Sequence, residues 1–295
     1  MLYLAVYITK DKILIMEKQK IIENFKKKII ENYSNQTIKN YLSVLKLFLE
    51  WVEKRNVNKL TNEVVKDYLF YCKNDKKYSF STMTQVITTI GFLFEKVLDK
   101  PIPKALDIKL EKPIHLPIVL SAKDISKILE VTKNIKHKTI LLLLYSGGLR
   151  LGELLNLKIG DIDSESMKIH IRRAKGKKDR YVMLSENALN LLSEYYKIYQ
   201  PKEYVFEGKK GGKYSPQSVQ TLFKTAIKKA EIKKKATVHS LRHSFATHLM
   251  DDGIDILYIQ ELLGHKRLET TQIYRQVSSY SINKIKSPAD KLKLE

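Results

Sequence analysis

The chain of 295 residues contains a single cysteine, Cys72, so no disulfide can form within it and no zinc site can be built from cysteine side chains. Tyr68, Leu69 and Phe70 lie just before Cys72, and this apolar setting predicts a buried structural thiol. Because a chain without disulfides fits a reducing compartment, we expect a cytoplasmic protein.

Long apolar runs are also missing. The apolar stretch LYLAVYI, residues 2–8, is much shorter than the roughly 20 residues that a membrane-spanning helix needs. It lacks the basic start and the small-residue cleavage site of a signal peptide. We therefore expect no membrane association, and residues 1–11 are interpreted as an N-terminal extension.

Acidic side chains are few relative to basic ones. The sequence has 32 Asp and Glu residues against 54 Lys and Arg residues, which gives a formal charge of +22 at pH 7. A field of this size attracts nucleic acids or anionic membrane surfaces, and the lack of a long apolar run favours nucleic acid. The glycines Gly208, Gly211 and Gly212 lack the lysine-serine spacing of a phosphate-binding loop, so no ATP or other cofactor is expected.

Residues 12–99 carry the apolar periodicity of helices. One apolar face recurs at intervals of three and four from Thr37 to Val52, and Ser34 or Asn35 supplies its N-cap. Further helices are predicted over residues 62–73 and from residues 79–81 onward, which gives a small all-α bundle. Its polar faces offer candidate contacts to DNA at Lys39, Lys46, Thr84 and Gln85, although an ordinary solvated helix face explains each of them equally well.

Prolines concentrate after this bundle. Four of the seven fall at Pro101, Pro103, Pro113 and Pro117, in a stretch without helical period. Because proline fixes φ and removes a backbone donor, residues 100–120 are predicted to be an extended linker between two domains.

Residues 121–275 are predicted to form a second domain, mostly helical with a small antiparallel sheet. A capping box at Ser121 precedes its first helix. The alternating apolar residues Met167, Ile169 and Ile171 predict one strand, and residues 181–184 predict another. Two further helices are expected, over residues 185–199 and from residues 215–216 onward.

The most unusual chemistry lies between His239 and Tyr274. HSLRH begins at His239, a Gly-His pair ends at His265, and Tyr274 follows nine residues later. Residues three apart, such as His239 and Arg242, face the same way on a helical turn. Arginine binds two phosphate oxygens at once, histidine donates hydrogen bonds or moves protons, and tyrosine can act as a nucleophile. This set of side chains suits a phosphodiester.

An upstream segment, TILLLLYSGGLRLGELLNLK, completes the pattern. Its apolar run predicts a buried helix that ends at Gly147-Gly148, and Arg150 follows at the start of a new helix that contains Glu153. A helix start attracts anions. With G-L-R-x-x-E-L followed by H-x-x-R, G-H and Y, the chain resembles the tyrosine recombinases of the lambda-integrase and Xer type, and is most similar to archaeal Xer-type members.

The resemblance implies roles for six residues. A lysine in the family's K-G-x-K-x-R hairpin protonates the departing 5′ oxygen, and Lys175 matches that lysine; alone, a lysine-rich turn is a solvated hairpin tip. The arginines would clamp the scissile phosphate, the two histidines would hold its developing charge, and the tyrosine would attack it. The implied catalytic residues are Arg150, Lys175, His239, Arg242, His265 and Tyr274.

The resemblance also implies an architecture and partners. The fold would be mainly α with a small antiparallel sheet, in which an α-helical core-binding domain and an α+β catalytic domain clamp double-stranded DNA. The protein would be a homo-oligomer, tetrameric at synapsis, with its C-terminal tail, residues 276–295, docked into a neighbouring protomer. Arg275-Gln276 stand where many bacterial Xer proteins have Thr-His, so the subgroup is open.

Three other interpretations compete with a recombinase. His239, His243 and His248 could suggest zinc, but no metalloprotease glutamate accompanies them and Arg242 would place a positive charge beside the ion. A topoisomerase-like enzyme would relax plasmids without a specific site. A non-catalytic DNA-binding protein on the same scaffold would keep its biological activity after Tyr274→Phe. Chromosome dimer resolution and integration of a mobile element both fit the sequence.

Overall fold

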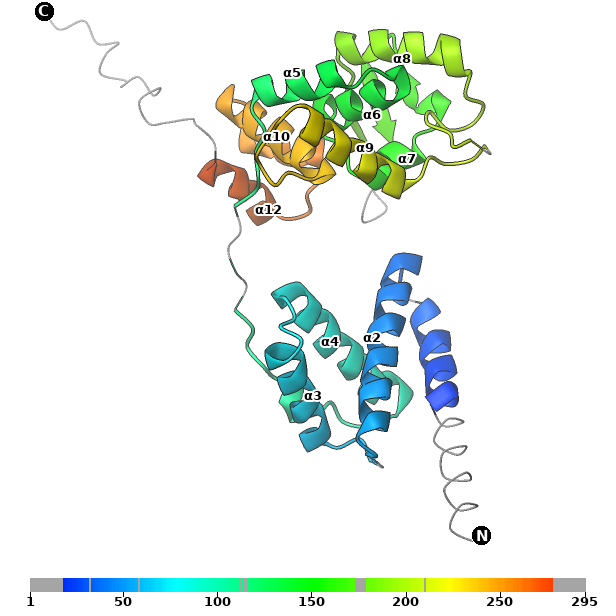
Figure 1. The fold of residues 1–295 in the computed structure, drawn as a ribbon, viewed down its shortest axis with the longest axis vertical. Coiled ribbons are helices and arrows are strands. Elements are labelled where there is room, and N and C mark those ends of the chain that lie inside the picture. Colours follow the sequence, from blue (N-terminus) through cyan, green and yellow to red (C-terminus); the bar gives the residue numbers. More distant parts are fainter. Residues whose placement is uncertain are drawn as a thin grey trace, which may run out of the picture. The chain divides into compact units, whose positions relative to one another are not determined.

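The computed structural model describes residues 18–31, 33–57, 59–111, 113, 116–172, 179–209 and 211–277. The chain forms two compact units, Met1–Ile114 and His115–Glu295 (Figure 1). The predicted extension, residues 1–11, and most of the predicted tail, residues 278–295, lie outside the described residues.

Helices are the only regular secondary structure in the described part of the first unit. Residues 18–30 are helical, and the named elements that follow are α2 (Asn35–Lys54), α3 (Asn62–Asn74), α4 (Phe80–Phe92), the π-helical turn η1 (Leu93–Val97) and the 3-10 turn η2 (Lys104–Leu106). Side-chain hydroxyls of Ser34, Thr61 and Ser79 accept hydrogen bonds from the first turns of α2, α3 and α4. Ser34, not Asn35, is therefore the cap of α2.

The core of this unit contains Phe25, Leu45, Phe48 and Ile90, all fully buried. Cys72 is buried with them, which confirms the structural thiol predicted from the sequence, and burial raises its pKa to about 11. A thiol with this pKa stays protonated at neutral pH and is a poor nucleophile.

The proline-rich stretch packs against a unit at both of its ends. Leu106 is buried in the helical core, where η2 contacts α3. Leu120 is buried in the second unit, and its N–H donates to Ser244 Oγ at 2.8 Å. The predicted linker, residues 100–120, therefore contains apolar side chains that belong to the two cores.

The second unit combines helices with one three-stranded sheet. In chain order its elements are α5 (Ala122–Val131), α6 (Ile135–Ser146), α7 (Leu151–Asn156), η3 (Ile159–Asp161), β1 (Ile162–Asp163), β2 (Lys168–Ile171), β3 (Arg180–Met183), α8 (Glu186–Tyr199), α9 (Pro216–Lys229), α10 (Val238–Asp251), α11 (Ile256–Leu263), α12 (Glu269–Gln272) and η4 (Ile273–Gln276). The predicted capping box at Ser121 is present. The mainly α fold with a small antiparallel sheet is thus confirmed.

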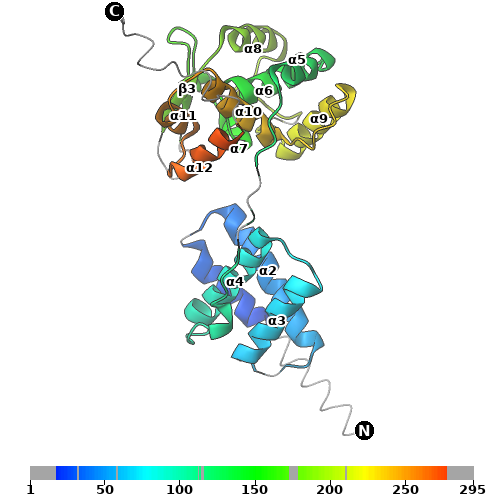
Figure 2. The ribbon, with the colours of Figure 1, turned by 90° about the vertical axis from the view of Figure 1, so that its left-hand side faces the viewer.

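The sheet has the order β1-β2-β3 and is antiparallel throughout. Ile169 pairs with Ile162 on one side and with Val182 on the other, and Ile169 and Ile171 face the core. The two-residue strand β1 was not predicted, because two residues are too few to show an alternating pattern. β3 lies against α11, which brings the sheet beside the C-terminal helices (Figure 2).

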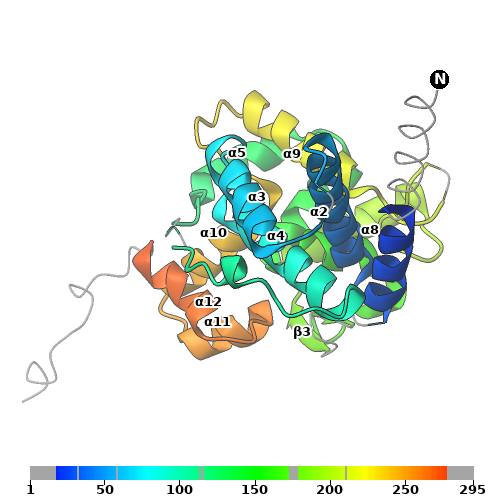
Figure 3. The same cartoon turned by 90° about the horizontal axis from the view of Figure 1, so that it is seen from below.

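Helix α6 forms the centre of the unit. Ile140, Leu141, Leu143 and Leu144 are almost completely buried, because α8, α9 and α10 pack around the helix. A helix that is apolar on all sides requires such enclosure. α5 and α9 lie side by side over the same core (Figure 3). The C-terminal end of α6 is therefore fixed, and the chain leaves it directly toward Arg150.

Candidate active site

Five of the six residues predicted to be catalytic lie in the described part of the second unit. Arg150 is the N-cap of α7, His239 and Arg242 lie in the first turns of α10, His265 follows α11, and Tyr274 lies in η4. α10 contacts α11 and η4, so residues distant in sequence meet around its N-terminal half (Figure 2). The sixth residue, Lys175, lies outside the described residues.

Gly148 sets the path of the chain between α6 and Arg150. Its φ is +56°, and a Cβ placed there would lie 2.4 Å from Cδ1 of Phe245 on α10. Both the left-handed backbone and the lack of space require glycine. The turn between α6 and α7 can thus press directly against the helix that carries His239 and Arg242.

Glu153 is the centre of a buried ionic network. Its carboxylate accepts two hydrogen bonds from Arg180, at 2.9 and 2.8 Å, and one from Nη1 of Arg150 at 2.8 Å. The backbone N–H of Arg150 also donates to it at 2.9 Å, and Nη1 of Arg242 lies 3.8 Å away. Burial acts to raise the pKa of Glu153, but the hydrogen bonds from Arg180 and Arg150 outweigh it and bring the pKa to about 2.

Arg242 is 1% exposed and is oriented by backbone carbonyls. Nη1 donates to the Gly148 carbonyl at 2.6 Å, and Nη2 donates to the Leu263 carbonyl. Its Nε has no hydrogen-bond partner among the described residues. Burial and the charge of Arg150 lower the pKa of Arg242 to about 9, so the guanidinium remains charged at neutral pH.

His265 has partners at both ring nitrogens. Nε2 lies 3.2 Å from Nη2 of Arg242, and Nδ1 lies 2.9 Å from Oγ1 of Thr271. Because arginine only donates, Nε2 must be the acceptor, and Nδ1 then carries the proton and donates to the threonine. Burial and the nearby arginines lower the pKa of His265 to about 3, which agrees with a neutral ring.

Tyr274 is 2% exposed and lies between two histidine rings. Its hydroxyl lies 3.1 Å from Nδ1 of His243, and its ring stacks on His265 with 6.3 Å between centroids. Burial dominates and raises the pKa of Tyr274, although the charges of Arg242 and Arg150 act in the opposite direction.

His239 is exposed at the start of α10, and its ring meets that of His243 edge to face at 4.5 Å. Desolvation and the charges of Arg242 and Arg150 lower its pKa. Among the described residues no group of three or more His, Cys, Asp or Glu side chains could hold a metal ion. The residues at this site would bind an anion.

Three contributors were not predicted from the sequence. Arg180 holds Glu153, His243 holds the Tyr274 hydroxyl, and Thr271 fixes the tautomer of His265. Two of these residues lie within motifs that the sequence analysis identified. Arg180 is the last residue of the K-G-x-K-x-R pattern, and His243 is the last of HSLRH.

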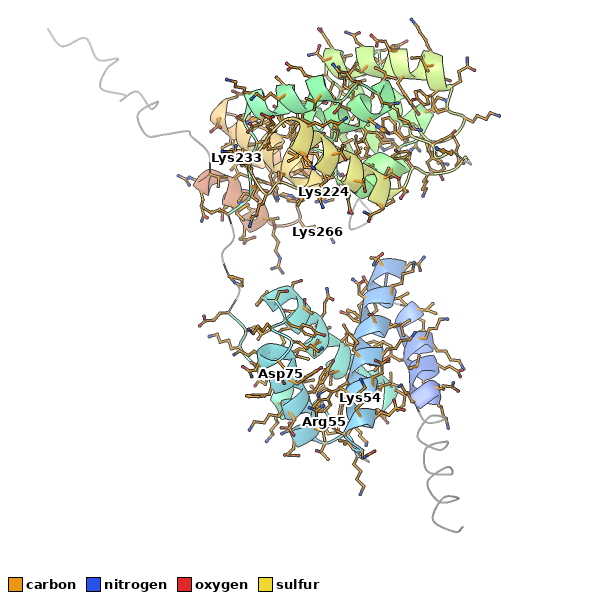
Figure 4. The ribbon with its side chains drawn as sticks, viewed as in Figure 1. Lys54, Arg55, Asp75, Lys224, Lys233 and Lys266 are labelled. Atoms are coloured by element: carbon orange, nitrogen blue, oxygen red, sulfur yellow. The ribbon has the colours of Figure 1, made fainter. Side chains whose placement is uncertain are left out.

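The candidate DNA contacts lie on neighbouring helices of the first unit. Lys39 and Lys46 on α2 and Thr84 on α4 are exposed, whereas Gln85 is half-buried. Exposed basic side chains also occur on the second unit; Figure 4 labels Lys224 on α9, Lys233 before α10 and Lys266 after α11. No helix in the described ranges is long and apolar enough to cross a membrane.

Family models match both units. The phage integrase family matches residues 119–280, and the N-terminal SAM-like domain of phage integrases matches residues 21–104. Tyrosine recombinase XerA of Pyrococcus horikoshii is 40% identical over 207 residues, which cover 68% of this chain and 71% of that protein.

Solved structures of recombinases are also similar to this chain. A XerA recombinase matches with 31% identity and a TM-score of 0.51, over 87% of this chain and 93% of that chain. The XerH site-specific recombinase bound to its difH substrate matches with 26% identity and a TM-score of 0.66, over 80% and 75% of the two chains. With matching models over both units and these relatives, the chain belongs to the phage integrase family and is a site-specific tyrosine recombinase.

Proposed function

We propose that Tyr274 attacks a phosphodiester of duplex DNA and forms a 3′-phosphotyrosine bond, while the 5′ oxygen departs as a hydroxyl. The observation that carries this proposal is that Tyr274 stacks on His265, which contacts Arg242, one of three arginines clustered around the Glu153 carboxylate. Arg150, Arg180 and Arg242 bring three positive charges and Glu153 brings one negative charge. The excess favours a bound phosphate.

The arginines would act on the transition state. Arg150 is partly exposed and Arg242 is held rigidly, so the two can present fixed donors to the non-bridging oxygens as negative charge develops there. His239 would add a hydrogen bond to the same oxygens. His265, whose Nε2 accepts from Arg242 in this structure, would donate to them only in the tautomer that carries its proton on Nε2. Lys175 would supply the proton to the leaving 5′ oxygen. One phosphodiester is exchanged for another, so the bond energy is conserved in the covalent intermediate and the reverse reaction rejoins DNA.

We further propose that four protomers act on two duplexes and that the C-terminal segment, residues 276–295, docks into a neighbouring protomer. XerH has been solved with its DNA substrate, which supports DNA as the partner of this chain. Lys39, Lys46, Thr84 and Gln85 are the proposed contacts of the first unit. The biological task would be resolution of chromosome dimers or movement of an integrated element.

Covalent trapping tests the nucleophile. Duplexes that carry candidate recombination sites, nicked next to the expected cleavage position, are incubated with wild-type protein and with Tyr274→Phe. The free strand end diffuses away after cleavage, so a covalent protein-DNA band should accumulate on a denaturing gel for the wild type alone. If Tyr274→Phe gave the same band, the nucleophile would be a different residue.

A second assay separates recombination from strand relaxation. Supercoiled plasmids with and without the site that gives the covalent band are incubated with the protein. A recombinase exchanges strands between two copies of the site. Relaxation of plasmids without the site, at a similar rate, would support a topoisomerase-like enzyme instead.

A further inference from the structure

We propose that His243 accepts the phenolic proton of Tyr274 when the DNA strand is cleaved and returns it when the strand is rejoined. This inference rests on the proposed role of Tyr274 as the nucleophile. The sequence resemblance assigns His239 and His265 to the phosphate, and it gives no role to His243.

The geometry places one ring nitrogen of His243 against the reacting oxygen. Nδ1 of His243 lies 3.1 Å from the Tyr274 hydroxyl, which is within hydrogen-bond distance. His243 projects from α10, where it directly follows Arg242, and Tyr274 comes from η4, which packs on that helix. The contact therefore joins two elements that are fixed by the hydrophobic cluster of Phe245, Ile259, Leu263 and Tyr274.

A base is needed because Tyr274 keeps its proton. The side chain is almost completely buried, and burial raises the pKa of the phenol in spite of the nearby arginines. A neutral phenol is a weak nucleophile, and a base that takes its proton in the transition state typically accelerates such a step by about 10²- to 10⁴-fold. Positive charge alone does not supply this activation.

The other two histidines of the site are less suited to the task. Both nitrogens of His265 are engaged, by Arg242 and Thr271, and its ring stacks face to face on the Tyr274 ring, so neither nitrogen has an open lone pair for the phenolic proton. His239 has no hydrogen bond to Tyr274 among the residues that the structure describes, and it meets His243 instead. Within the described site, His243 is the nitrogen base in contact with the hydroxyl.

The charges around His243 fit a proton acceptor. Burial and the neighbouring His239 and Arg242 bring the pKa of His243 to about 4, so the free protein holds a neutral ring with a lone pair for the phenol. A bound phosphate carries negative charge close to Arg242 and offsets that repulsion. The proton affinity of His243 therefore rises when substrate is present, which moves it toward the range where a base is most effective.

The step balances. The Tyr274 oxygen forms its bond to phosphorus as its proton passes to Nδ1 of His243, and the bond from phosphorus to the 5′ oxygen breaks as that oxygen takes a proton from Lys175. Resealing runs the same transfers backward. No external acid, base or oxidant is required, and the enzyme returns to its starting protonation state.

His243→Asn is the informative variant, because an asparagine side chain can place an acceptor near the position of Nδ1 but cannot hold the proton. We expect single-turnover cleavage of the nicked duplex to fall by about 10²- to 10⁴-fold in His243→Asn and in His243→Ala. The matched control is His248→Asn, since His248 lies on the same helix and its Nδ1 meets a hydroxyl, that of Tyr145, at 2.9 Å. It should cleave at the wild-type rate.

A more acidic nucleophile tests the proton transfer itself. Replacing Tyr274 by a fluorinated tyrosine lowers the pKa of the phenol, so it should restore much of the rate lost in His243→Ala and change the wild type little. Thermal unfolding and DNA-binding titrations of each variant would show that folding and affinity are retained. A purely structural role for His243 predicts no rescue.

The outcomes separate the two proposals. Wild-type rates in His243→Asn, or slow rates that fluorinated tyrosine does not improve, would overturn the role of His243 while leaving Tyr274 as the nucleophile. A wild-type protein that forms no covalent band with any duplex would instead overturn the proposed function.

Discussion

The carboxylate of Glu153 receives both terminal guanidinium nitrogens of Arg180, at 2.9 and 2.8 Å, and both side chains are 8% exposed. Arg180 also donates from Nε to the Leu262 carbonyl at 2.9 Å, next to the loop that carries His265. The pair therefore joins β3 to α7 and to the end of α11. It fixes three segments of the active site at one point.

The ion pair between Glu153 and Arg180 should make the free energy of unfolding fall at low pH. The pKa of Glu153 is about 2 in the folded chain against an ordinary value of 4.5, so its contribution is fully present above pH 4.5 and is lost as the pH falls toward 2. This shift corresponds to roughly 3 kcal/mol of unfolding free energy. Urea unfolding between pH 6 and pH 2 is the measurement.

Two variants control the experiment. Glu153→Gln should be less stable than the wild type at neutral pH by about 3 to 5 kcal/mol, because it leaves buried arginines without a counter-charge. Its residual stability should depend less on pH in the acidic range. Glu194→Gln removes an exposed glutamate from α8 and should leave the pH dependence unchanged. Equal pH profiles for Glu153→Gln and wild type would contradict the assignment.

Loss of either of the two arginines proposed to bind the phosphate, Arg150 and Arg242, should stop cleavage without preventing DNA binding. Arg150→Ala and Arg242→Ala each remove a fixed charged donor at the developing charge, which typically costs about 3 to 4 kcal/mol, or 10²- to 10³-fold in rate. Covalent trapping and DNA-binding titrations measure the two properties separately. Arg172→Ala, an exposed arginine paired with Asp161, should retain cleavage. Substantial cleavage by Arg150→Ala or Arg242→Ala would refute the proposed roles.

Two glycines in the same segment should respond in opposite ways to alanine. Gly148→Ala places a methyl group 2.4 Å from the Phe245 ring at a φ of +56°, and should reduce stability by about 1 to 3 kcal/mol. Gly152 lies in α7, and a Cβ there meets no atom within 4 Å. Gly152→Ala should therefore stabilise the protein by up to about 1 kcal/mol. The measurement is the melting temperature of each variant relative to the wild type. A lower melting temperature for Gly152→Ala would contradict the prediction.

Lys175 can be tested by changing the leaving group. Lys175→Ala should slow cleavage by about 10²- to 10⁴-fold, because the departing 5′ oxygen then lacks its proton donor. A duplex with sulfur in place of that bridging oxygen should restore the rate, since a thiolate leaves without a proton. The same duplex should not rescue Tyr274→Phe. Failure to rescue Lys175→Ala would assign this lysine to another role.

Local signals predicted much of the fold. The helices began at the hydroxyl caps expected from the sequence, as at Ser34, Ser79 and Ser121, because capping depends on neighbours along the chain. β1 was missed because it gains its structure only by pairing with β2. The burial of Leu106 and Leu120 was not predicted, since no neighbour along the chain indicates which core each side chain joins.

The same distinction between local signals and tertiary packing applies to the active site. Motif spacing indicated Arg150, Arg242, His265 and Tyr274, and the fold brings these residues around α10. The partnership of Arg180 with Glu153 spans 27 residues and depends on how β3 meets α7, which spacing does not reveal. Burial of the Tyr274 hydroxyl against His243 is likewise a property of packing, and this burial raises the pKa of the phenol.

The partners of Arg242 have an evolutionary consequence. Its two terminal nitrogens are held by the carbonyl oxygens of Gly148 and Leu263, which belong to the backbone and not to side chains. No substitution can delete a backbone carbonyl group, so these two hydrogen bonds do not depend on which side chains surround the guanidinium. Sequences can diverge widely while the arginine keeps its orientation, provided the turns at these two positions survive.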